Sequence, residues 1–256
     1  MSFDPVERHH YIRRLVVEER ENGEYRRYYR FRPARWYGGV FTGDCAGCGL
    51  LCRFCWLSDR ALYKPGSIGR LYSPSHVAER LVIGAESRGY HKVRLSGGEP
   101  TISMSHLLDV LDRLDGKIPL FILETNGILI GSSEDYAAAL SKYKFIHVRV
   151  SIKGCSGEEF HKLTGADEEG FKIQLNSLRH LVKHGIACHP SVVASFSTQK
   201  AFKSLLDELE AINPQLKMNV EVEELILYPH VVKRLKRYGL KYFIAHPPNK
   251  IPPEQI

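Results

Sequence analysis

Four cysteines lie within eleven residues of the chain, at positions 45, 48, 52 and 55. Disulfides between such near neighbours would be strained, because a disulfide requires a specific separation of its two backbones. Thiolates gathered this closely indicate a metal site. Zinc ribbons separate their two ligand pairs by roughly a dozen residues, whereas only three residues separate Cys48 from Cys52. The spacing therefore favours a compact loop that wraps one face of an iron–sulfur cube.

The last three of these cysteines resemble a known signature. Cys48-x3-Cys52-x2-Cys55, with Phe54 before the last cysteine, resembles the motif of the radical S-adenosylmethionine enzymes. In that family three thiolates hold a 4Fe-4S cluster, and the open iron binds the amino and carboxylate groups of S-adenosylmethionine. One electron cleaves the sulfonium and gives a 5′-deoxyadenosyl radical that abstracts hydrogen from a substrate. The resemblance implies that Cys48, Cys52 and Cys55 bind the cluster and that Cys45 does not.

Two glycine-containing turns extend the resemblance. The segment 96–100 reads Ser-Gly-Gly-Glu-Pro and is similar to a family turn in which small residues let backbone approach the ligand. There, backbone carbonyls and Glu99 are expected to receive the ligand's ammonium group. The segment 124–127 reads Glu-Thr-Asn-Gly and resembles a turn that contacts ribose hydroxyls. The implied S-adenosylmethionine site consists of Phe54, Gly97, Gly98, Glu99, Pro100, Thr125, Asn126, Arg149 and Ser151.

In layout the chain most resembles the glycyl-radical activating enzymes, such as that of pyruvate formate-lyase. These enzymes are about this short, and they share an Ile-Lys-like strand ending and a Leu-Thr-Gly-like stretch, here 152–153 and 163–165. They carry an acidic residue where Ser151 stands, and it helps bind a monovalent cation beside the ligand carboxylate. Trp56, directly after the last cysteine of the motif, instead resembles the tRNA-modifying wybutosine enzymes, which lack the Gly-Gly-Glu-Pro turn.

The departure at Ser151 draws attention to Arg149, two residues upstream on the same strand face. We predict that its guanidinium replaces the cation and pairs with the ligand carboxylate, a charge-assisted contact. The alternative is a structural ion pair with Glu221 or Glu223 across the inside of the sheet.

Six strand-like runs alternate with amphipathic helical segments from Trp36 onward. The predicted strands are Tyr37–Phe41, His91–Ser96, Pro119–Glu124, Phe145–Ile152, Ile186–Phe196 and Met218–Leu227. A helix is expected to begin at Ser73-Pro74, and others to cover 171–182 and 202–212. With the resemblance, this order predicts an α/β fold, a partial (β/α)6 TIM-like barrel whose cluster loop follows the first strand.

Residues before the barrel predict an N-terminal hairpin. Tyr11–Glu19 and Glu24–Phe31 are rich in β-branched and aromatic residues, and Asn22-Gly23 joins them. We therefore divide the chain into a hairpin extension (1–35), a radical S-adenosylmethionine core (36–227) and a basic C-terminal segment (228–256).

Several of the predicted strands alternate polar and apolar residues. In the fourth, residues 147, 149, 151 and 153 are polar and share one face, and the apolar residues between them share the other. Outer helices would bury the apolar face, so the polar faces would line the inside of a curved sheet. The alternative is an antiparallel sheet with one solvated face.

Composition places the chain among soluble globular proteins. Its 256 residues are 43% hydrophobic and 25% charged, and no run of 18 uncharged apolar residues occurs. A cytoplasmic protein with no membrane partner is expected. The net charge of +7 is concentrated at the ends, since residues 228–250 carry six Lys or Arg and no acid. Basic ends are either solvated or face an anionic partner.

The substrate is left open by the sequence. Layout favours a protein glycine, the basic ends favour RNA, and a small molecule fits equally. The expected cofactors are a 4Fe-4S cluster and S-adenosylmethionine, reduced by an external one-electron donor such as flavodoxin or ferredoxin. A different class of protein, a non-catalytic iron–sulfur electron carrier, would use Cys45 to close the fourth iron.

Overall fold

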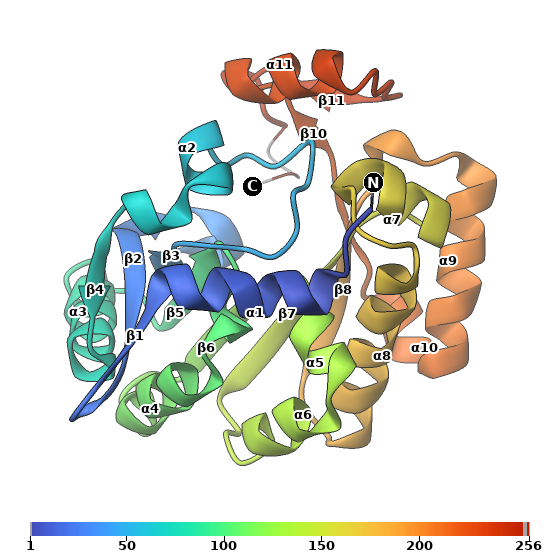
Figure 1. The fold of residues 1–256 in the computed structure, drawn as a ribbon. Coiled ribbons are helices and arrows are strands. Elements are labelled where there is room, and N and C mark those ends of the chain that lie inside the picture. The colour runs from blue at the N-terminus through green and yellow to red at the C-terminus, as the bar shows by residue number, and fades with distance from the viewer. Residues whose placement is uncertain (1, 253–254, 256) are drawn as a thin grey trace.

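Six parallel strands form the centre of the molecule, in the order β3-β5-β6-β7-β8-β9 (Figure 1). Their bounds are β3 (Val40–Cys45), β5 (Lys92–Gly97), β6 (Leu120–Thr125), β7 (Ile146–Ile152), β8 (Cys188–Val193) and β9 (Glu221–Glu223). The computed structural model describes residues 2–252 and residue 255. The α/β class and the partial barrel predicted from the sequence are confirmed, with the cysteine loop directly after the first parallel strand.

The outer layer consists of helices that connect these strands. They are α3 (Pro74–Glu86), α4 (Met104–Leu114), α5 (Ile128–Ser132), α6 (Glu134–Leu140), α7 (Gly157–Thr164), α8 (Glu169–Lys183), α9 (Gln199–Ile212) and α10 (Pro214–Met218). Helix α3 begins where predicted, because the Ser73 hydroxyl accepts the backbone N–H of His76. Val148 and Val150 of β7 are buried in the same apolar core as Leu178 of α8, so the apolar strand faces point outward to the helices.

The polar faces meet on the inside of the barrel. Arg149, Ser191 and Glu221 lie on three adjacent strands, and the Arg149 guanidinium donates to the other two side chains. All pairings among the six strands are parallel, which excludes the antiparallel alternative.

The segment expected to begin the hairpin is a helix instead. Helix α1 spans Pro5–Val16, and only Val17–Arg20 forms a strand, β1. Asp4 caps the first turn by accepting two backbone N–H groups, and a proline occupies the first helical position. Ile12 and Val16 are one turn apart on the buried face. The prediction of a strand for residues 11–16 is wrong, because capping and this helical spacing outweigh β propensity.

The hairpin itself is present and belongs to the central sheet. Strand β1 pairs with β2 (Gly23–Ala34), with Arg20 opposite Gly23, so the turn is Glu21-Asn22, one residue before the predicted Asn22-Gly23. Strand β2 then pairs antiparallel with β3 and with β4 (Arg70–Tyr72). The sheet is therefore continuous across residue 35, and the domain boundaries given above stay predictions.

The first parallel strand begins later than predicted. Residues Trp36–Gly38 form a 3-10 turn in which Tyr37 has a φ of 58°. Gly38 and Gly39 also have positive φ values, and this backbone cannot continue as a strand. Strand β3 therefore starts at Val40 and reaches Cys45.

The last two parallel strands are shorter than predicted. Strand β8 ends at Val193, where a 3-10 turn over Ala194–Phe196 follows. Met218 ends α10, and only Glu221–Glu223 pairs with β8. Residues Leu225–Ile226 form β10, which pairs with β11 (Ala245–His246) in a separate two-stranded sheet.

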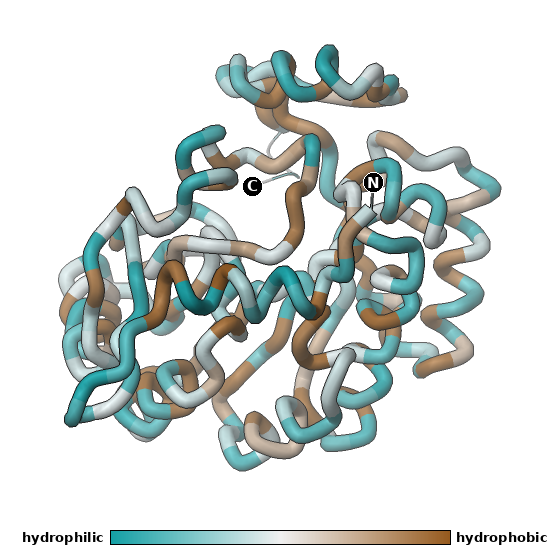
Figure 2. The backbone as a smooth tube through the Cα atoms, in the orientation of Figure 1, coloured by the Kyte–Doolittle hydropathy of each residue, from teal (hydrophilic) through white to brown (hydrophobic). Residues whose placement is uncertain are grey.

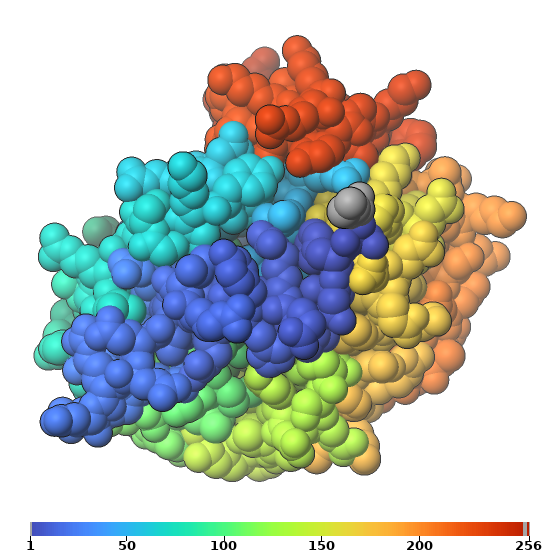
Figure 3. Space-filling model, in the orientation of Figure 1, coloured from blue at the N-terminus to red at the C-terminus, as the bar shows by residue number. Residues whose placement is uncertain are grey.

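The C-terminal segment lies over the cysteine loop. Helix α11 (Pro229–Arg237) is seen above that loop and above α2 (Asp59–Tyr63) in Figure 1, and the space-filling view shows the segment packed on this region (Figure 3). Hydrophilic and hydrophobic residues alternate along α11 (Figure 2). Within residues 2–252, no helix is long and apolar enough to cross a bilayer. Residue 1 of the predicted hairpin extension and residues 253, 254 and 256 of the basic segment lie outside the described residues.

Candidate functional site

The three predicted cluster cysteines lie on the loop that follows β3. Cys52 is buried, and Cys48 and Cys55 are partly buried. The loop turns between the last two, where the Cys55 N–H donates to the Cys52 carbonyl at 3.0 Å. Cys45 is separate from this loop, because it ends β3 and its thiol donates to the Ser96 carbonyl at 3.2 Å.

The Gly-Gly-Glu-Pro turn packs directly on this loop. The Gly98 N–H donates to the Cys45 carbonyl and the Glu99 N–H to the Gly47 carbonyl, both at 2.7 Å. A Cβ at position 98 would lie 2.2 Å from the Gly47 carbonyl oxygen. Gly97 has a φ of 89°, which favours glycine. The glycines are thus required for the approach of one loop to the other.

Burial raises the pKa of each of the three thiols, that of Cys52 to about 12. Two cations act against burial near Cys52 and Cys55, namely Lys153 and Arg234. Thiolates are the form that binds metal. The donor set therefore fits an iron–sulfur cluster, because the positive charge of its iron–sulfide core would stabilise three buried thiolates.

Glu99 joins the two turns of the site. Its Oε1 accepts from the Thr125 hydroxyl at 2.7 Å and from both the backbone N–H and the hydroxyl of Thr101. Its Oε2 accepts the Asn126 N–H at 2.7 Å. Burial raises the pKa of this carboxyl, and the hydrogen bonds oppose that effect. Glu99 thus holds the turn 124–127 against the glycine turn 96–100. A contact between Glu99 and the ligand's ammonium group stays a prediction.

Asn126 links the second turn to the cysteine loop. Its amide nitrogen donates to the Cys48 sulfur at 3.4 Å and to His9 Nε2 at 2.9 Å. The backbone carbonyl of Asn126 accepts from Gln174 Nε2. Neither His9 nor Gln174 was identified from the sequence. Gln174 carried one signal that could have revealed it, since it is a polar residue that lies on the buried face of α8.

Ser151 lies at the end of β7, beside a cation that the site prediction omitted. The Lys153 ammonium donates to the Ser151 hydroxyl and lies 5.9 Å from the Phe54 ring centroid. Gln174 fixes this strand end by donating to the Ser151 carbonyl and accepting the Lys153 N–H. Lys153 could have been identified from the sequence, because it continues the alternating polar residues of β7.

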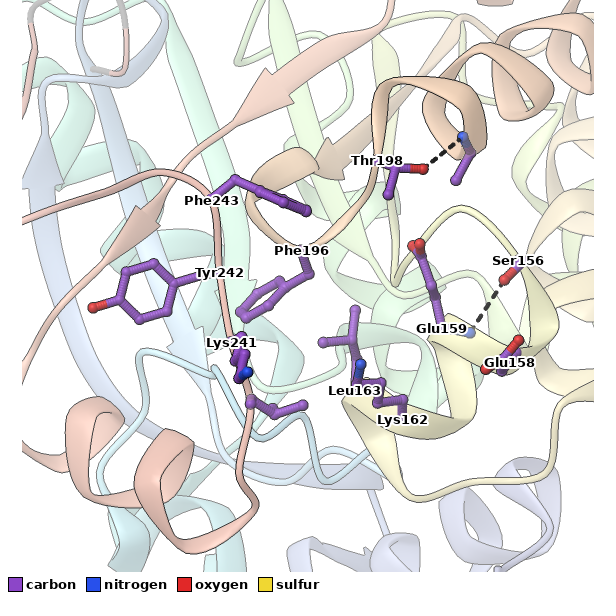
Figure 4. Close-up of a pocket in the computed structure, with 12 residues that line it drawn as sticks. Ser156, Glu158, Glu159, Lys162, Leu163, Phe196, Thr198, Lys241, Tyr242 and Phe243 are labelled. Atoms are coloured by element: carbon purple, nitrogen blue, oxygen red, sulfur yellow. Dashed lines mark hydrogen bonds between the residues drawn. The ribbon is translucent and has the colours of Figure 1, made fainter.

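A cavity of about 420 Å³ is lined by Phe196, Leu163 and Phe243, among others (Figure 4). It lies between α7, the start of α9 and residues 240–243. Phe196 lines it, and its ring centroid is 5.2 Å from that of Phe54. Leu163, also in its lining, accepts the Arg53 N–H from the cysteine loop. This cavity is therefore next to the predicted site, separated from it by one aromatic contact.

Arg149 is engaged by protein carboxylates. Its guanidinium donates to both carboxylate oxygens of Glu221 at 2.8 Å, to Glu223 and to Ser191. Burial acts to lower the pKa of Arg149, but these acids raise it well above its ordinary value. The structural ion pair left open in the sequence analysis is present, and pairing of Arg149 with the ligand carboxylate stays a prediction.

A second ion pair, between Arg94 and Glu124, lies inside the barrel beside that of Arg149. Arg94 donates to Glu124 at 2.8 Å, and the Tyr37 hydroxyl donates to the same carboxylate at 3.0 Å. Burial alone would raise the pKa of Glu124, but Arg94 and Arg149 lower it to about 2. The strained Tyr37 backbone places its hydroxyl in this network.

The chain belongs to the Radical SAM superfamily, whose family model matches residues 44–209. That range contains the cysteine loop and both turns. The cofactors of this family are a 4Fe-4S cluster and S-adenosylmethionine. The fold agrees, since the crystal structure of SuiB from Streptococcus suis with S-adenosylmethionine bound superposes with a TM-score of 0.58. The match has 19% identity and covers 75% of this chain and 44% of SuiB.

Curated relatives by sequence are named GTP 3′,8-cyclases. The probable cyclase of Thermococcus kodakarensis is 28% identical over 137 residues, 54% of this chain and 41% of the relative. The cyclase of Aquifex aeolicus is 27% identical over 147 residues, 51% of this chain and 44% of the relative. The chain therefore spans about two fifths of the length of these relatives. Likeness to the glycyl-radical activating enzymes in particular is not supported by these matches.

Proposed function

We propose that this protein cleaves S-adenosylmethionine reductively at a 4Fe-4S cluster held by Cys48, Cys52 and Cys55, and uses the resulting radical to abstract hydrogen from a substrate. The observation that carries the proposal is the packing of the glycine turn on the cysteine loop, with Gly98 N–H on the Cys45 carbonyl. The contact supports the proposal because it holds the turn that resembles a ligand-binding turn against the cysteine loop.

The cluster, when bound, supplies one electron and an open iron for the amino and carboxylate groups of S-adenosylmethionine. The chain's own residues orient the ligand. We expect backbone carbonyls of Gly97 and Gly98 to accept from its ammonium group, and Thr125 and Asn126, which Glu99 holds by hydrogen bonds, to contact the ribose. We expect the Lys153 ammonium, which lies beside Ser151 and Phe54, to pair with the carboxylate.

Anaerobic reconstitution tests this proposal. With S-adenosylmethionine and dithionite, the wild-type chain should produce 5′-deoxyadenosine. Alanine at Cys48, Cys52 or Cys55 should abolish both iron uptake and product, whereas Cys45→Ala should preserve them, because its thiol is committed to the Ser96 carbonyl. Loss of iron in Cys45→Ala would instead favour the non-catalytic electron carrier. Flavodoxin or ferredoxin should replace dithionite if either is the physiological donor.

For the substrate, our first candidate is a protein glycine. It rests on the short layout and on the segments 152–153 and 163–165. Peptide, RNA and GTP should be compared by the transfer of substrate deuterium into 5′-deoxyadenosine. GTP is included because the curated relatives are named for it. Transfer from a deuterated glycine residue would support the candidate, and transfer from deuterated GTP alone would contradict it.

RNA is a second candidate, favoured by exposed aromatic residues in the cysteine loop and in the C-terminal segment. These are Trp56, Tyr238 and Phe243, and the Arg53 guanidinium lies 4.3 Å from the Tyr238 ring centroid. Exposed aromatics with cations bind single-stranded nucleic acid by stacking and charge. Phe243→Ala should weaken the binding of bulk cellular RNA in gel shifts at several salt concentrations. Ile83 is another exposed apolar residue, and the control variant Ile83→Ala should bind RNA as the wild type does. Unaltered micromolar binding in Phe243→Ala would remove this candidate.

A further inference from the structure

Arg234 reaches the cysteine loop from a helix that lies beyond the matched range 44–209. It belongs to the basic segment that is expected to be solvated or to face an anionic partner, but its side chain is only 2% exposed. Its Nη2 donates to the Cys55 carbonyl and, at 2.9 Å, to the Leu57 carbonyl. The solvated reading is therefore wrong for Arg234. This side chain holds the end of the loop that carries the third predicted cluster ligand.

The positive charge of Arg234 is only partly matched by protein. One carboxylate is close, with Asp59 Oδ1 at 3.4 Å from Nε, and Asp59 is half-exposed. Nη1 is buried, and it has no hydrogen-bond partner among residues 2–252 and 255. A buried guanidinium with a free donor is costly unless another anionic or accepting group completes it.

Arg234 is bonded to the backbone of a predicted cluster ligand, since its Nη2 donates to the Cys55 carbonyl. Its positive charge acts to lower the pKa of the Cys55 and Cys52 thiols. A cluster with three thiolates is negatively charged when oxidised and gains a further negative charge on reduction. Hydrogen bonds to sulfur and nearby charge are the means by which proteins tune the potential of such clusters.

We propose that Arg234 is a positioning residue for the cluster: it fixes the Cys55–Leu57 backbone and places a buried positive charge that favours the one-electron-reduced cluster. The proposal rests on the proposed function, since it assigns Cys55 as a ligand. Electrons come from the external donor, and Arg234 neither gives nor takes a proton. Its charge raises the reduction potential and so makes the reduction easier.

The test compares reduction potentials of the full chain, reconstituted anaerobically with iron and sulfide. Arg234→Gln removes the charge and keeps a side-chain donor. Lys236→Gln removes an exposed charge from the same helix and is the matched control. Asp59→Asn removes the counter-charge of Arg234. Iron content and the electron paramagnetic resonance signal of the reduced cluster are followed during a redox titration.

The expected potential of Arg234→Gln is more negative than that of the wild type, and that of Asp59→Asn is more positive. The reduction potential of Lys236→Gln should equal that of the wild type. If Arg234→Gln takes up no iron, the variant Arg234→Lys is used instead. A cluster at the wild-type potential in Arg234→Lys supports the role of the positive charge. A folded Arg234→Lys chain without a cluster would show that Arg234 only holds the backbone, and this result overturns the proposal.

Two further results would overturn it. One is an unchanged potential in both Arg234→Gln and Asp59→Asn, and the other is an equal shift in Lys236→Gln. Failure of the proposed function is a separate outcome, since the wild-type chain would then take up no cluster or yield no 5′-deoxyadenosine.

Discussion

His9 and Asn126, which are 117 residues apart in the sequence, are joined by a hydrogen bond of 2.9 Å. His9 Nδ1 faces the Pro5 carbonyl, which can only accept, so Nε2 is the acceptor for the Asn126 amide. The second amide hydrogen of Asn126 is directed to the Cys48 sulfur. Helix α1 is thereby connected, through one side chain, to a predicted cluster ligand.

Substituting His9 should loosen the cysteine loop. His9 is fully buried against the loop, since a Cβ at Gly49 would lie 2.2 Å from His9 Nδ1. His9→Ala leaves a void and an unpaired amide, which costs on the order of 2–3 kcal/mol of unfolding free energy. We expect faster loss of the cluster on exposure to a chelator. Denaturant unfolding and chelator-release rates check this, with the exposed His10→Ala as the control; equal behaviour of the two variants would contradict the connection.

The close approach at Gly98 predicts a loss of function with a small side chain. Gly98→Ala places a methyl group 2.2 Å from a backbone oxygen of the cysteine loop. Since backbone cannot retreat as a flexible side chain does, the turn must move, and S-adenosylmethionine affinity should fall tenfold or more, on the order of 1.4 kcal/mol. Calorimetric titration of the reconstituted protein measures this. Gly89→Ala, where a Cβ meets nothing within 4 Å, should bind normally.

Replacing Arg149 distinguishes its two interpretations. In Arg149→Leu, the carboxylates of Glu221 and Glu223 face each other without a cation, so unfolding free energy should fall by about 1–3 kcal/mol. A contact with the ligand carboxylate would in addition weaken S-adenosylmethionine binding about tenfold. We expect lowered stability with an unchanged dissociation constant, because the guanidinium is already occupied. A weakened dissociation constant in a variant of undiminished stability would restore the sequence-based prediction.

His106 predicts an acid sensitivity of the fold that is separate from the cluster. Burial lowers its pKa from 6.5 to about 4, and its ring contacts the Tyr28 hydroxyl and the Glu24 carbonyl. Below pH 6.5 the His106 ring is protonated in the unfolded chain but stays neutral in the folded chain. The free energy of unfolding therefore falls as the pH falls towards 4, by about 1 kcal/mol per pH unit at most. His106→Gln should flatten this slope in denaturant titrations between pH 7 and pH 4.5. Parallel slopes for the variant and the wild type would show that His106 does not contribute.

Local patterns in the sequence were sufficient to predict the superfamily and most of the barrel. The cysteine spacing and the two glycine turns are contiguous segments, so their residues stay near one another in any fold. Strands β5, β6 and β7 were predicted within a few residues of their bounds, because each is a run of alternating or continuous apolar residues between clear turn residues.

Tertiary structure alone decided what surrounds that chemistry. The run 11–16 has strand-forming residues, yet it is helical, and its Ile12 and Val16 pack against Gly47 of the cysteine loop. Arg149 and Arg234 carry the same charge in the sequence, but their partners come from β9 and from the cysteine loop, which only folding brings to them. A side chain's partner depends on which distant segments meet, and no local pattern of one sequence encodes that meeting.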